Sequence, residues 1–212
     1  MSARREEIVD IARDLFAGKG YAATSMRDIA DASSLLVGSL YSHFRSKAEI
    51  VELIVTPFYA RLIPAQREAV EAGGTGAEQL ERMVRRVLQL CAQHNAEVAI
   101  LHYDWPQLSQ MEDLGAVMAR SQETLDLWLA VLTAGVADGS LRASIDAETA
   151  MRVITSAIHS VVDRQRYGAR EDLVGSSGVE ALVDDVVRTF VAGLGNRGSA
   201  KPGSKPALGE RA

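Results

Sequence analysis

The residues with the clearest chemical use lie in the run SMRDIADASSLLVGSLYSHFRSK, which spans residues 25–47. The second half of this run is rich in small and polar side chains. Ser39 can hydrogen-bond a base edge or a phosphate, and Tyr41, His43 and Lys47 carry groups that suit phosphate oxygens. These residue types at this spacing predict a segment that docks into the major groove of double-stranded DNA.

Two short helices joined by a tight break are needed to hold these side chains in place. Ser25 and Asp28 have the spacing of a capping box, which predicts that the first helix starts at Met26. The polar cluster at 31–34 offers side-chain partners to the backbone and should end that helix. A second helix is then expected over residues 37–44, and the pair forms a helix-turn-helix.

The second helix should have a buried side and an exposed side. Leu40 and Phe44 are expected to point inward, and Leu35 and Leu36 should pack the turn into the core. Gly38 removes bulk where the backbone would meet DNA. The exposed side then carries Val37, Gly38, Ser39, Tyr41, Ser42 and His43. The spacing alone also fits a solvated amphipathic helix of an ordinary all-α domain.

A resemblance to a known family favours the DNA-binding interpretation. Residues 4–60 resemble the N-terminal DNA-binding domain of the TetR family of bacterial transcriptional regulators, through the motifs AGKGYAATSM, RDIADAS and GSLYSHFRSKAEI. The resemblance extends over nearly the whole recognition helix. It implies that the positions at the DNA are Thr24, Arg27, Ser39, Tyr41, His43 and Lys47.

Charge divides the chain of 212 residues into three parts. Residues 1–47 hold seven Lys or Arg and six Asp or Glu, residues 48–194 hold 12 and 21, and residues 195–212 hold four and one. The acidity behind the net charge of −5 therefore lies away from the DNA-binding head at 1–47. We expect a helical effector-binding and dimerisation body at 48–194 and a disordered tail at 195–212. Because the head is nearly neutral, two heads should act together on DNA.

The 3.6-residue hydrophobic period recurs throughout, so an all-α protein is expected. It should have an N-terminal three-helix DNA-binding domain followed by a larger helical domain. Ser46 and Glu49 have capping-box spacing and predict the start of the helix that connects the two. Pro57 and Pro64 are expected to kink or break that helix.

Two strongly amphipathic helices are expected near the end of the body, with apolar stripes that run from Ala150 to Val162 and from Val179 to Leu194. Their apolar stripes are two residues wide at every turn, so each helix could meet its own subunit and also present apolar surface outward, for example at Val187. Burial of both helices within one subunit is the alternative. The family resemblance implies a homodimer in which these two helices pack against their symmetry mates.

Large apolar side chains in the body predict a cavity for a lipophilic guest. They are Phe58, Tyr103, Trp105, Met111, Met118 and Trp128. Ordinary core packing is the alternative. The head and residues 80–108 also resemble actinobacterial repressors of fatty-acid and steroid degradation that respond to acyl-CoA esters. That resemblance implies a role for Arg164, Arg166 and Arg170 in holding CoA phosphates.

An enzyme would need a catalytic constellation, and the candidates are His94, His102, Asp104, His159 and Cys91. Residues 102 and 104 fall on different faces of a helix, and no known nucleophile, metal or phosphate motif is present. We expect no catalysis, no metal and no cofactor. The single cysteine fits a reducing compartment, and the apolar stretch at 127–137 is too short to span a bilayer, so a cytoplasmic protein is expected.

The interpretation is a homodimeric, ligand-responsive transcriptional regulator of the repressor type, released from a palindromic operator by a lipophilic molecule such as an acyl-CoA. The effector would favour a head separation that does not match the operator. The alternative is a helical small-molecule-binding protein without specific DNA binding.

Overall fold

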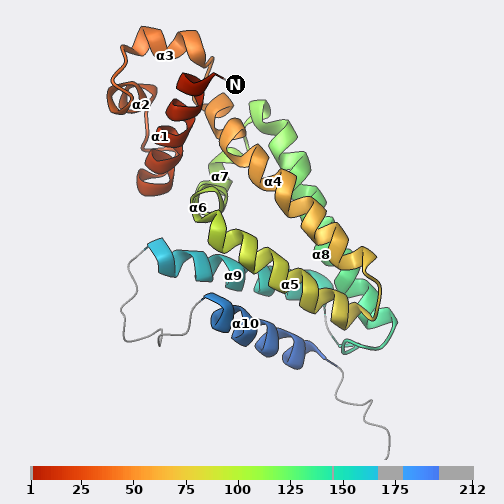
Figure 1. The fold of residues 1–212 in the computed structure, drawn as a ribbon. Coiled ribbons are helices and arrows are strands. Elements are labelled where there is room, and N and C mark those ends of the chain that lie inside the picture. Colours follow the sequence, from red (N-terminus) through yellow and green to blue (C-terminus); the bar gives the residue numbers. More distant parts are fainter. Residues whose placement is uncertain (1, 145, 167–178, 196–212) are drawn as a thin grey trace, which may run out of the picture.

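The computed structural model describes residues 2–144, 146–166 and 179–195, and Figure 1 shows their arrangement. These residues form α1 (Ala3–Lys19), α2 (Met26–Ala32), α3 (Val37–His43), α4 (Lys47–Glu71), α5 (Gly76–Gln93), α6 (Asn95–Tyr103), α7 (Trp105–Leu108), a 3-10 turn η1 (Glu112–Leu114), α8 (Gly115–Ala137), α9 (Ala147–Arg166) and α10 (Val179–Leu194). The all-α prediction is confirmed. None of the helices described is long and apolar enough to cross a membrane.

The head consists of α1, α2 and α3, packed around fully buried residues that include Phe16, Ile29 and Leu40. The predicted capping box at the start of α2 is confirmed. The Ser25 amide donates to the Asp28 carboxylate (2.7 Å), and the Asp28 amide donates to the Ser25 hydroxyl (3.1 Å). The turn that follows α2 places Ser34 at a φ of +55°, in the left-handed region, and so redirects the chain into α3.

Helix α4 leads out of the head as one continuous helix of 25 residues, with Pro57 and Pro64 inside it. Of the two outcomes predicted for these prolines, a kink or a break, the break is wrong. Tertiary packing explains the difference, because α4 is buried against α5 and α8 along its length. Ser46 caps the helix as predicted, but the Glu49 carboxylate accepts instead from the Arg45 amide (2.7 Å).

Helices α5 and α8 meet at a contact between two glycines. A Cβ atom built on Gly76 would lie 2.2 Å from backbone atoms of Gly135, a distance that real side chains do not show. The amide of Gly76 donates to the Asp138 carboxylate (2.7 Å), and the amide of Ala77 donates to the Ser140 hydroxyl (3.0 Å). The C-terminal end of α8 and the turn after it thus hold the start of α5 in place.

The two final helices differ in how the subunit uses them. Helix α9 packs against α5, α6 and α8, whereas α10 packs against α5. Val187 is 4% exposed, so the expectation that it faces outward is wrong: it faces the body of its own subunit. On α9, Val153 is 51% exposed. The tail predicted at 195–212 lies, apart from residue 195, outside the described residues.

Candidate functional site

The exposed surface of α3 is small and polar. Gly38, Ser39, Tyr41 and Ser42 are exposed, and the Tyr41 side chain projects with 53% of its area accessible. The Ser42 hydroxyl donates to the backbone carbonyl of Ser39 (2.6 Å). Val37 and His43, at the two ends of the helix, are half-buried. Apart from Tyr41, the exposed side chains of α3 are small, so this surface can enter a groove.

Two other residues assigned to the DNA surface differ in their exposure. The Arg27 side chain is 82% exposed on α2, 3.9 Å from Asp31, and its guanidinium is free to meet a phosphate. Thr24 is 1% exposed, and its hydroxyl donates to the carbonyl of Gly20 (2.8 Å). The Thr24 side chain therefore supports the loop before α2 and offers no free donor at the surface.

Lys47 has an internal role that the sequence pattern does not show. Its Nζ donates to the backbone carbonyls of Tyr21 (2.6 Å) and Thr24 (2.7 Å) and lies 3.9 Å from the centre of the Tyr21 ring. Burial lowers the pKa of this ammonium, and the carboxylates of Asp104 and Asp28 act in the opposite direction. An ammonium has three N–H donors, so one remains for an outside partner. Lys47 thus joins the loop before α2 to the first turn of α4.

Leu36 is the surface residue that sequence reasoning missed. It immediately precedes α3 and is 83% exposed, whereas Leu35 packs against the core. The expectation that Leu36 plugs the turn is wrong: after the left-handed residue Ser34, Leu35 packs against the core and Leu36 does not. An exposed leucine beside the docking helix can make apolar contact with a thymine methyl group.

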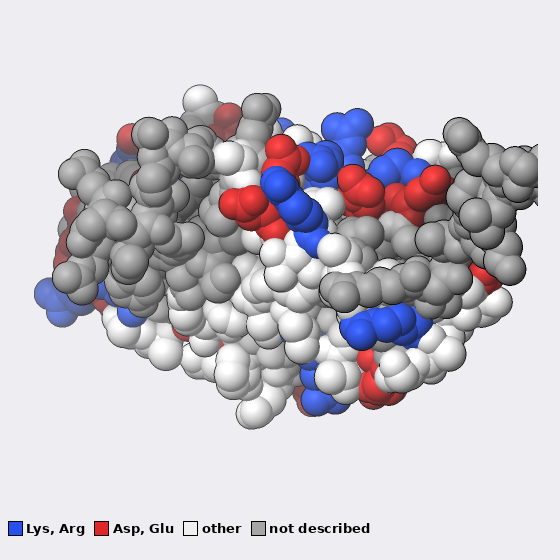
Figure 2. Space-filling model, turned by 90° about the horizontal axis from the view of Figure 1, so that it is seen from below, with Lys and Arg blue, Asp and Glu red and all other residues white. Residues whose placement is uncertain are grey.

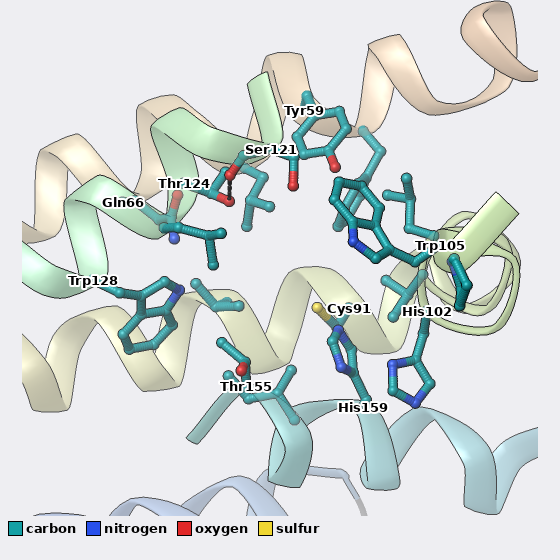
Figure 3. A pocket seen from close by; sticks show the side chains of 18 residues that line it. Tyr59, Gln66, Cys91, His102, Trp105, Ser121, Thr124, Trp128, Thr155 and His159 are labelled. Atoms are coloured by element: carbon teal, nitrogen blue, oxygen red, sulfur yellow. Dashed lines mark hydrogen bonds between the residues drawn. The ribbon is translucent and has the colours of Figure 1, made fainter. Parts of the chain in front are cut away.

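The body contains a cavity of about 440 Å³ that is partly open to solvent. Residues from α4 to α9 line it, and Figure 3 shows Gln66 and Trp128 at one end and Trp105 and His102 at the other. Of the side chains predicted to line a cavity, the structure places Phe58, Trp105 and Trp128 in its wall. Tyr103, Met111 and Met118 do not line it. The side chains of Arg164 and Arg166, and all of Arg170, lie outside the described part of the chain.

Polar side chains line part of the cavity. They include the Tyr59 hydroxyl, the Gln66 carboxamide, the Thr124 and Thr155 hydroxyls and the His159 imidazole. Among the described lining residues, none is Lys, Arg, Asp or Glu. Because an unpaired charge is costly to bury, the enclosed part of a ligand should be uncharged and mostly apolar.

The residues considered for catalysis do not form a nucleophile and base. Burial raises the pKa of the Cys91 thiol to about 12, so this cysteine holds its proton at neutral pH. Burial, helped by the nearby His102 ring at 4.2 Å, lowers the pKa of His159 to about 4. The Asp104 carboxylate accepts a hydrogen bond from the Tyr21 amide in the head. The Nε2 atom of His94 lies 2.8 Å from the guanidinium of Arg61, within hydrogen-bond distance. No three His, Cys, Asp or Glu side chains in the described residues are grouped as metal ligands.

One contact links the cavity wall to the head. Asp104, at the corner between α6 and α7, accepts a hydrogen bond from the Tyr21 amide (2.9 Å), in the same loop whose carbonyls bind Lys47. The next residue, Trp105, lines the cavity. Helix α1 also packs against α6. A change in the position of Trp105 would therefore move the adjacent Asp104 and, through its hydrogen bond to the Tyr21 amide, the head.

Comparisons with known proteins match both parts of the chain. Residues 8–54 match the family described as "Bacterial regulatory proteins, tetR family", and residues 73–163 match "Tetracyclin repressor-like, C-terminal domain". The HTH-type transcriptional repressor KstR2 of Rhodococcus jostii is 36% identical over 193 residues, which cover 91% of this chain and 92% of that protein.

Two solved structures have the same fold. The ketosteroid transcriptional regulator KstR2 of Mycobacterium tuberculosis superposes with a TM-score of 0.79 at 25% identity, over 93% of this chain and 97% of that one. AibR, solved in complex with isovaleryl coenzyme A and operator DNA, superposes with a TM-score of 0.72 at 20% identity, over 88% of this chain and 97% of that one.

Proposed function

This chain belongs to the TetR family of bacterial transcriptional regulators, and we propose that it is a homodimeric repressor that leaves its operator when a lipophilic ligand fills the cavity. The observation that carries the proposal is the adjacency of Asp104 and Trp105. One binds the amide of Tyr21 in the head, and the other forms part of the cavity wall. A ligand that displaces Trp105 would thus change the placement of the head and favour a conformation that does not match the operator.

The DNA contacts follow from the exposed surface of the head, taken as residues 1–47. We propose that α3 enters the major groove and that Arg27 and the remaining N–H of Lys47 meet phosphates. Thr24 takes part through the loop it supports. The residues of the docking surface are Val37, Gly38, Ser39, Tyr41, Ser42 and His43, with Leu36 added from the structure. A palindromic operator follows from the two-fold symmetry of a dimer. We place the protein in the cytoplasm, where such DNA is accessible.

The effector proposed is an acyl-CoA. The cavity wall is largely apolar, with no Lys, Arg, Asp or Glu among its described residues, and therefore suits an acyl group. AibR, which shares the fold, was solved in complex with isovaleryl coenzyme A and operator DNA. The repressor KstR2 is the relative that supports repression. The phosphates of CoA would need cations outside the cavity, and Arg164 and Arg166 are the proposed ones.

The test is operator release by a panel of acyl-CoA esters. We expect one of them to lower affinity for the DNA flanking this protein's gene by roughly 1 to 3 kcal/mol, measured by gel shift, and to change the fluorescence of Trp105 and Trp128. By reciprocity, saturating operator DNA should weaken effector binding by the same factor. An acyl-CoA that binds equally with and without DNA is not the inducer. Ligand binding without any specific DNA complex would support the alternative of a helical ligand-binding protein.

The dimer interface proposed uses α9 and α10. Figure 2 shows the molecule from below, where uncharged surface lies between small clusters of both charge signs. On α10, Arg188 and Asp185 form an exposed ion pair (3.3 Å). We expect Val153→Glu to split the dimer in sedimentation experiments, because an unpaired carboxylate costs several kcal/mol to bury. Arg152→Glu, one residue earlier and on a different face of α9, is the control. A Val153→Glu protein that is still dimeric at micromolar concentration removes this residue from the interface.

A further inference from the structure

We infer that Gln66 recognises an oxygen atom, a hydroxyl or a ketone, at one end of the effector, so that the effector is not a plain saturated chain. Gln66 lies on α4 and is 0% exposed. Both its amide nitrogen and its amide oxygen lack a hydrogen-bond partner among the described residues. The inference rests on the proposed function, because it concerns the ligand that this cavity holds.

An unpartnered carboxamide in this position needs an explanation. The large majority of buried side-chain polar atoms in proteins have a hydrogen-bond partner, and leaving one unpaired is costly. The side chain of Gln66 forms part of the cavity wall, and Figure 3 shows its two polar atoms at the end that Trp128 also lines. A leucine would fill the same space without a polar atom. The carboxamide is therefore placed to bond whatever occupies the cavity.

The surroundings of Gln66 define the chemistry of that partner. Thr124, at the same end, already donates its hydroxyl proton to the carbonyl of Ser121 (2.8 Å). The carboxamide offers two N–H donors and one acceptor. A hydroxyl can accept from Nε2 and donate to Oε1, and a ketone can accept from Nε2. Leu62, Val87 and Leu125 line the same cavity and suit the carbon skeleton of the ligand.

A ligand without such an oxygen would be penalised. In the ligand-free protein both amide atoms of Gln66 are buried, and neither has a partner among the described residues. A terminal methyl group beside the carboxamide would leave both amide atoms unpaired, whereas a hydroxyl would give each of them a partner. Gln66 is thus a specificity residue that selects among lipophilic molecules of similar size.

The experiment compares saturated acyl-CoAs of increasing chain length with the same chains hydroxylated at the last carbon. Binding is measured by tryptophan fluorescence to the full-length protein, Gln66→Leu and the control Gln122→Leu, whose residue is exposed on α8 outside the cavity. At the chain length that reaches Gln66, we expect the unmodified protein to prefer the hydroxylated chain by about tenfold or more. Gln66→Leu should reverse that preference, and Gln122→Leu should keep it.

A second measurement needs no ligand. Gln66→Leu should raise the Tm of the ligand-free protein, because it removes two unpartnered buried atoms and keeps the volume, and a lower Tm would overturn the inference. The inference would also be overturned if the unmodified protein and Gln66→Leu showed the same preference between hydroxylated and saturated chains at every chain length. In that case the proposed function would still stand if acyl-CoAs bind the protein and release it from its operator. If the protein binds its operator but no chain of either kind binds, the proposed effector class and the inference fail together.

Discussion

A Lys47→Met variant should lose about two orders of magnitude in operator affinity, because each head of the dimer would contribute roughly 1.4 kcal/mol of lost binding. Methionine keeps the aliphatic stem and removes the ammonium. The loss has two sources: one phosphate contact, and the hydrogen bonds to Tyr21 and Thr24 that order the loop before α2. Gel shifts at several salt concentrations should show a salt slope shallower by about two for the dimer.

Two further variants compare the effect of Lys47→Met with the loss of another cation and with the loss of an apolar contact. Lys19→Met removes an exposed cation from the same head and should change operator affinity far less than Lys47→Met. Leu36→Ala should leave the salt slope unchanged and weaken binding only to operators with thymine opposite this residue. If Lys47→Met binds its operator as tightly as the unmodified protein, neither the phosphate contact nor the support of the loop is correct.

The second large effect is expected from Gly76→Ala, which should destabilise the body by about 3 kcal/mol and lower its Tm by roughly 10 °C. The added Cβ would lie 2.2 Å from backbone atoms of Gly135, and a backbone cannot move aside as a flexible side chain can. Calorimetry or circular dichroism would measure the change.

Gly115→Ala is the matched control. It also changes the first residue of a long helix, but a Cβ atom there meets nothing within 4 Å. Since alanine favours helices and restricts the unfolded chain, Gly115→Ala should leave stability unchanged or raise it slightly. A Gly76→Ala protein as stable as Gly115→Ala would show that α5 and α8 can separate at no cost.

Local sequence signals predicted local structure well in this chain. The Ser25–Asp28 capping box is a contact between residues three apart, so it could be read without knowledge of the fold. Pro57 and Pro64 follow an equally local rule that predicted a break, but the packing of α4 against α5 and α8 offsets the lost hydrogen bonds. Burial by distant helices is not visible in a hydrophobic period.

The candidate site shows the same limit. Trp105 and Trp128 line the cavity, whereas Met118 has the same apolar character and does not. The difference depends on where each residue falls around its helix relative to helices far away in sequence. Gln66 had no signal of its own, because a polar residue in an amphipathic helix is usually solvated; its significance comes from being fully buried.

Because α4 is one continuous helix, a tilt at its cavity end displaces the head at its other end. Its 25 residues make a rod of about 37 Å, with the head at one end and the cavity residues Phe58, Leu62 and Gln66 along its middle and far half. A tilt of about 5° over that length moves the tip by about 3 Å, close to the rise of one base pair. A ligand therefore does not need to unfold or detach either head. Shifting each one out of register with its half-site by a single step of the double helix is enough.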